Sequence, residues 1–142
     1  MLLASAAALA ACSPASQKGN EADAREAAES VLDALRREDA ASLWERLTPG
    51  TRDELYANDA DDFARDLAAT DWSELTWEIG PVIDYEISWG VHAMVSPAGV
   101  SRILVDRGLL GGWDEAGFVI LVQVTDVGGY LVAGQGLDTD MR

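Results

Sequence analysis

The chain has 142 residues, of which 49% are hydrophobic and 25% are charged. A chain of this length supports one domain with a single core, and its apolar content excludes a wholly disordered protein. The formal net charge is -15, from 25 acidic and 10 basic residues. Because such a charge repels phosphate backbones and anionic lipid headgroups, it argues against nucleic-acid binding and against electrostatic attachment to membranes.

The first 12 residues form an uncharged, mostly apolar run that ends at the only cysteine of the chain. Its end, Leu9-Ala10-Ala11-Cys12, resembles the lipobox of bacterial lipoproteins, which is Leu, two small residues and Cys. The resemblance implies that residues 1–11 are a removable export signal and that Cys12 carries acyl chains such as palmitate. The run has no Lys or Arg before it, which predicts a truncated signal, and it is shorter than the about 20 residues that span a bilayer.

The residues after this run divide into a linker and a domain. Residues 12–20 contain the lipidated cysteine followed by small and polar residues without periodicity, which predicts a flexible tether. Periodic structure begins after Asn20, so residues 21–142 are expected to form one domain. A lone buried or reactive thiol is the alternative for Cys12, and we favour the lipid acceptor because the cysteine precedes any folded pattern.

Short helices are predicted between residues 20 and 70. Asn20 is suited to cap the first one, because its side-chain oxygen can accept a hydrogen bond from an early backbone N–H. This helix has an apolar stripe at i, i+3, i+4 and i+7 spacing, formed by Ala28, Val31, Leu32 and Leu35. Later helices are expected to start at caps of their own, which are Asp39, Thr51 and Asp59.

From Leu75 the hydrophobic period changes to two, which is typical of strands. Gly80-Pro81 is expected to interrupt the first strand. A longer alternation follows from Ile83 to Val95, in which Ile83 and the residues in phase with it form the apolar face. Because this run is long for one strand, we expect a bend or a turn near residues 88–90.

Further strands are predicted towards the end of the chain. We expect a strand at 102–106 and a loop at 108–112 that carries Trp113. Residues 118–124 are nearly all apolar, which predicts a central strand, and residues 126–129 predict a hairpin turn into a last strand. Helices followed by antiparallel strands predict an α+β fold, with N-terminal short helices packed on one face of a curved antiparallel sheet.

Two segments carry a resemblance to a known family. Residues 31–49 contain a helix that ends at an acidic step and a second helix that runs into a Thr-Pro turn, and residues 118–132 form the closing hairpin. These segments resemble the two ends of the nuclear-transport-factor-two-like (cystatin-like) domains found in bacterial lipoproteins. The resemblance implies a cone-shaped fold whose sheet wraps around a cavity closed by helices. It carries no catalytic residue onto this chain.

His92, the only histidine, is the first candidate for chemistry. By simple alternation it shares a strand face with Asp84, so a carboxylate could orient the imidazole in an acid/base pair. Such a pair would suit a pocket enzyme of the isomerase, dehydratase or hydrolase type. The alternative, which we favour, is that both residues belong to the solvated face of the strand.

An acidic cluster lies at the predicted start of one helix, and it consists of Asp59, Asp61, Asp62 and Asp66. A calcium loop needs Gly at its sixth position and an acidic residue at its twelfth, where this chain has Ala64 and Thr70. We therefore expect a solvated helix start, with no metal and no cofactor.

The chain has five tryptophans, and two of them are candidates for ligand binding. Trp72 and Trp113 lie in predicted connecting segments, whereas the other three are in phase with apolar neighbours and are expected in the core. The apolar strand 118–124 could also pair across a two-fold axis in a homodimer, although an ordinary central strand is favoured.

These features predict an exported protein, lipid-anchored to the bacterial cell membrane on its periplasmic or extracellular face. Its domain is expected to bind a small molecule or an envelope protein rather than to transform a substrate. The alternatives are the pocket enzyme and a purely structural interaction module. An open, polar cone cavity would favour the first, and a cavity filled by side chains would favour the second.

Overall fold

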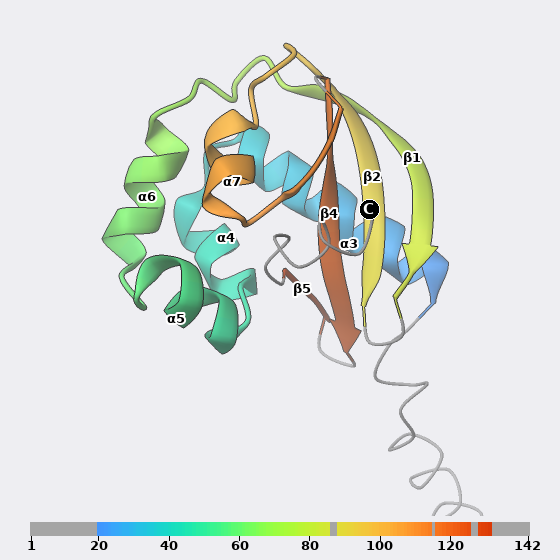
Figure 1. Cartoon of the computed structure of the whole chain (residues 1–142), viewed down its shortest axis with the longest axis horizontal. Helices are drawn as coiled ribbons and strands as arrows, with labels where there is room; N and C mark the ends of the chain where they lie inside the picture. The colour runs from blue at the N-terminus through green and yellow to red at the C-terminus, as the bar shows by residue number, and fades with distance from the viewer. Residues whose placement is uncertain (1–19, 86–87, 115, 126–127, 132–142) are drawn as a thin grey trace, which may run out of the picture.

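Within the described residues, four helices precede the antiparallel sheet along the chain (Figure 1). The computed structural model describes residues 20–85, 88–114, 116–125 and 128–131. The predicted signal segment 1–11, Cys12 and the tether up to residue 19 lie outside the described residues. The helices are α3 (Glu21–Arg36), α4 (Ala40–Arg46), α5 (Pro49–Tyr56), α6 (Ala60–Ala68) and, between two strands, α7 (Arg102–Arg107).

The sheet is antiparallel and has the order β1-β2-β4-β3, with β5 also paired to β4. Its strands are β1 (Thr76–Asp84), β2 (Trp89–Ser96), β3 (Gly111–Asp114), β4 (Gly117–Thr125) and β5 (Gly128–Leu131). One edge of β4 pairs with β2, and the other edge pairs with β3 near its start and with β5 near its end. The α+β prediction is confirmed, and so is the central position of the apolar strand.

The helix starts follow local side-chain caps. The Oδ1 atom of Asn20 accepts a hydrogen bond of 3.0 Å from the backbone N–H of Asp23, and Asp39 and Asp59 cap α4 and α6 in the same way. The predicted start at Thr51 is wrong. Helix α5 begins at Pro49, because the fixed φ of proline suits the first helical position.

Residues 102–106 form a helix, so the predicted strand there is also wrong. Helix α7 ends at Gly108, whose φ of 96° is left-handed and whose N–H bonds to the carbonyl groups of Leu104 and Val105. Trp113, expected in a loop, lies in β3, because residues 111–114 pair with the first part of β4.

Strand β1 continues through Gly80-Pro81 by means of a β-bulge. Ile79 pairs with Ala93 and Val82 pairs with Val91, so two residues of β1 lie opposite one residue of β2. The extra residue inverts the alternation that the sequence suggests. Val82 now packs against the core, whereas Ile83 faces away from it and is 39% exposed.

The core lies between the helices and one face of the sheet, which we call the inner face. The apolar stripe of α3 is buried against it, as predicted, and α3 contacts β1, β2, β4 and β5. On the central strand, Phe118, Ile120 and Val122 point into this core and are at most 1% exposed. Burial of this apolar surface is the main force that holds the helices on the sheet.

A charged cluster joins α5, α6 and α7 at the edge of the core. The guanidinium of Arg107 contacts both carboxylate oxygens of Asp66, at 2.9 and 3.0 Å, and donates to Asp62 at 3.2 Å. The Tyr56 hydroxyl donates to Asp66 at 3.0 Å, and Arg107 lies 4.7 Å from the centre of the Tyr56 ring. The predicted acidic cluster is therefore divided between a helix cap and this ion-pair network.

The network fixes the charge states of two of its members. Burial, together with the negative charge of Asp66, raises the pKa of the Tyr56 hydroxyl above its ordinary value, so it stays protonated as a donor. Partial burial opposes the charged form of Arg107, but its hydrogen bonds to Asp66 and Asp62 outweigh this and raise the pKa of the guanidinium. We interpret the cluster as a connection between helices, because its members satisfy one another.

The substitution Arg107→Met tests this interpretation, since it leaves the carboxylate of Asp66 buried without its counter-ion. A broken buried pair costs about 3–5 kcal/mol, and we expect a loss of about 2 kcal/mol because water partly screens the exposed side of Arg107. Arg102→Met is the matched control on the same helix. Its side chain is 81% exposed, as measured in its pair with Asp106, and we expect a change below about 0.5 kcal/mol. Equal losses in urea denaturation would contradict a stabilising role of the cluster.

Candidate functional site

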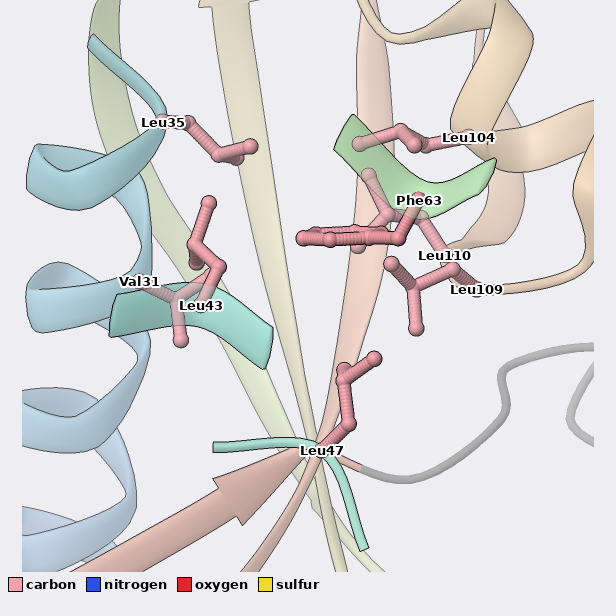
Figure 2. Close-up of a pocket in the computed structure, with 8 residues that line it drawn as sticks. All are labelled: Val31, Leu35, Leu43, Leu47, Phe63, Leu104, Leu109 and Leu110. Carbon is pink, nitrogen blue, oxygen red and sulfur yellow. The ribbon is translucent and has the colours of Figure 1, made fainter. Parts of the chain in front are cut away.

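Between the helices and the sheet, the part of the interior that the structure describes is lined by apolar side chains. Figure 2 shows eight apolar side chains that converge on one small space, and they are Val31, Leu35, Leu43, Leu47, Phe63, Leu104, Leu109 and Leu110. Each of them is at most 3% exposed. The volume open to the centre of a water-sized sphere is about 10 Å³, which is about what one water molecule needs. The cavity that the resemblance implies is therefore filled by side chains at this place.

His92 lies on the opposite face of the sheet, which we call the outer face. It is 4% exposed, and its Nδ1 atom is 3.0 Å from the carbonyl oxygen of Pro81 in the bulge. Because a carbonyl oxygen only accepts hydrogen bonds, Nδ1 carries the hydrogen and donates it. The Trp113 ring packs edge-on against the imidazole, with 4.6 Å between the ring centres.

The structure does not bring Asp84 and His92 to the same face. After the bulge, Asp84 is in phase with Val82 and pairs with Trp89, and both of these pack against the core. The prediction that Asp84 and His92 share a strand face is wrong, because simple alternation does not count the extra residue. The ring nitrogen that a carboxylate was expected to orient is instead held by a backbone carbonyl.

The two candidate tryptophans occupy very different places. Trp72 is fully buried, and its Nε1 atom donates a hydrogen bond of 3.0 Å to the carbonyl oxygen of Leu67. Its indole is therefore part of the core and is inaccessible to a ligand at the surface. Trp113 is 38% exposed on the outer face, next to His92.

Among the described residues, the large apolar side chains that remain exposed all lie on the outer face. They are Ile83, Met94 and Trp113, with exposed fractions of 39%, 38% and 38%, and we call them the outer-face patch. Beneath them, His92 and its pairing partner Val119 are buried but do not belong to the main core. Met94 and Trp113 are neighbours, because a Cβ atom at Gly117 would lie 3.1 Å from the Met94 sulfur and 2.8 Å from the Trp113 ring. Ile83 lies further along the same face, where it pairs with Gly90.

Two glycines allow aromatic rings to approach the backbone closely on this face. A Cβ atom at Gly117 would come within 2.8 Å of the Trp113 ring, and one at Gly90 would come within 2.6 Å of the Tyr85 ring. At the far end of its indole, Trp113 reaches Gly80 of the bulge, where a Cβ atom would be 3.6 Å away. The exposed indole is thus positioned by the backbone of three strands.

The sequence contained a signal for this surface that alternation alone does not use. Gly80-Pro81 inside a strand pattern is typical of a bulge, and a bulge moves the next apolar residue to the other face. Simple alternation places Met94 in the polar phase of its strand, so the alternation does not indicate that its side chain belongs to an exposed apolar surface.

Comparisons of the chain with protein-family models, with curated proteins and with solved structures gave no match. Among the described residues, no helix has the length and apolar character needed to cross a membrane. In the same part of the chain, no group of three or more His, Cys, Asp or Glu residues is arranged to hold a metal ion.

The close contact between Gly117 and Trp113 leads to a stability prediction. In Gly117→Ala the new Cβ would also lie 3.0 Å from the carbonyl oxygen of Ala93 and 3.1 Å from the sulfur of Met94. We expect a loss of about 1–3 kcal/mol in unfolding free energy, together with a change in Trp113 emission as the ring is displaced. Gly50→Ala is the control, because nothing lies within 4 Å of its Cβ. The packing account fails if Gly117→Ala is as stable as the wild type.

Proposed function

We propose that this protein is an exported lipoprotein, anchored to the membrane through Cys12, whose domain binds an envelope partner through the outer face of its sheet. The binding role is supported by one observation: among the described residues, apolar side chains pack the helix side of the sheet, whereas the exposed large apolar side chains lie on the other side. The anchor is supported by the sequence Leu9-Ala10-Ala11-Cys12.

The alternative of a pocket enzyme has less support. The imidazole of His92 is buried and bonded to a backbone carbonyl, and Asp84 belongs to the other face of the sheet. General acid/base catalysis needs a titratable group within hydrogen-bonding reach of a bound substrate. The small space in Figure 2 is lined by apolar side chains and supplies no such group.

The anchor predicts a specific modification. Mass spectrometry of the protein from its native membrane should show a chain that begins at Cys12 and carries diacylglycerol, and a Cys12→Ser variant should lack this mass and appear in the soluble fraction. An unmodified, soluble wild-type chain would rule out the anchor.

The binding role predicts where a partner makes contact. With a photoreactive amino acid in place of Met94, irradiation of the intact cell envelope should give a cross-linked product with a second molecule. The same amino acid in place of Arg102, which is exposed on α7, is the control and should give none. Products from Arg102 alone, or none from Met94, would show that the outer face is not the contact surface.

A further inference from the structure

Positive and negative side chains are distributed differently over the helices and the sheet. Every arginine of the described residues lies in a helix or at a helix end, and they are Arg25, Arg36, Arg37, Arg46, Arg52, Arg65, Arg102 and Arg107. The described strands contain no Lys or Arg, but they contain acidic residues at Glu78, Asp84 and Asp114. The charged side chains of the strands are thus all acidic.

Several arginines of the helices pair with acidic residues of the helices, and Arg36 also lies 5.0 Å from the centre of the Trp77 ring in β1. On α3, Arg36 and Arg37 both bond to Asp33, at 2.8 and 3.0 Å. These hydrogen bonds hold the pKa of the Asp33 carboxyl below its ordinary value. Arg46 and Arg52 in turn donate to groups of neighbouring helices. On the outer face of β1 the charged side chain is that of Glu78, because Asp84 belongs to the other face.

A carboxylate lies directly beside the outer-face patch. Glu78 is exposed and pairs in register with Met94, which pairs on its other side with Gly117 beneath the Trp113 ring. Residues that pair across neighbouring strands share a face of the sheet. The face thus combines exposed apolar side chains with an adjacent negative charge.

We propose that the outer-face patch binds a positively charged amphipathic segment of a partner protein. The apolar side chains of that segment cover Ile83, Met94 and Trp113, and a Lys or Arg beside them pairs with Glu78. The Trp113 indole offers a ring face to a cation, and the flexible thioether of Met94 adapts to the apolar groups it meets. This inference rests on the proposed binding role of the outer face, and it is independent of the anchor at Cys12.

The negative charge of the protein also disfavours two other binding partners at this face, a second copy of the chain and an anionic lipid surface. A second copy would bring another net charge of -15 and another sheet whose described strands carry no basic residue, so like charges would meet. An anionic lipid surface would be repelled for the same reason. A basic protein segment is the occupant whose charge complements the face.

The test uses the full chain and two synthetic peptides that form amphipathic helices with the same leucine face. One peptide has Lys on its polar face and the other has Glu. We expect the Lys peptide to bind, with an affinity that falls as salt is added, and the Glu peptide not to bind. Met94→Ser and Trp113→Ala should each weaken binding by about tenfold or more, with folding of each variant checked by urea denaturation.

Two charge variants separate local pairing from general attraction to an acidic protein. Glu78→Gln should weaken binding of the Lys peptide and reduce its salt dependence. Glu29→Gln, which removes an equal charge from the exposed side of α3, should leave both unchanged.

Each contrary outcome overturns a different statement. Binding of both peptides, with loss in Met94→Ser, would keep the binding face but refute the basic partner. Binding of the Lys peptide that neither Met94→Ser nor Trp113→Ala weakens would refute the site itself, as would absence of binding. A dimer in sedimentation velocity that Met94→Ser dissociates would make a second copy the occupant.

Discussion

Helix α3 buries its apolar stripe against the inner face of the sheet, and this contact determines which face of the sheet stays exposed. Once α3 lies across β2 and β4, helices α4, α6 and α7 close the remaining space with leucine side chains and Phe63 (Figures 1 and 2). Among these described side chains, close packing leaves a space of about 10 Å³, which is about what one water molecule needs. The large apolar side chains that stay exposed in the same part of the chain lie on the outer face of the sheet.

The bulge in β1 determines which side chains of this strand lie on the outer face and how His92 is held there. The extra residue at Gly80-Pro81 places Ile83 outside and supplies the carbonyl oxygen that holds the His92 imidazole. The buried imidazole then forms one side of the support for Trp113, and Gly117 forms another. One backbone irregularity thus accounts for an exposed apolar residue, a buried histidine and part of the support of an exposed indole.

Features that depend on neighbouring residues could be predicted from the sequence. The caps at Asn20, Asp39 and Asp59 and the apolar stripe of α3 follow from local hydrogen bonding and helical periodicity. The orientation of Ile83 could not be predicted, because the register of β1 depends on pairing with β2 and one extra residue inverts it.

Trp113 was predicted as a binding candidate because it was expected in an exposed loop. It is instead in strand β3, whose pairing with β4 places its side chain on the exposed outer face. The short helix α7 was missed because a single turn of apolar residues has no clear period.

The central claim is that this domain binds through the outer face and not through its interior. Methyl NMR tests it most directly, since Ile83 and Met94 report on the outer face, and Leu43 and Leu104 report on the interior. Titration with the lysine-rich amphipathic peptide should shift the methyl signals of Ile83 and Met94 and leave those of Leu43 and Leu104 in place. Shifts confined to the interior leucines would show a ligand entering between the helices and the sheet, and would contradict the account.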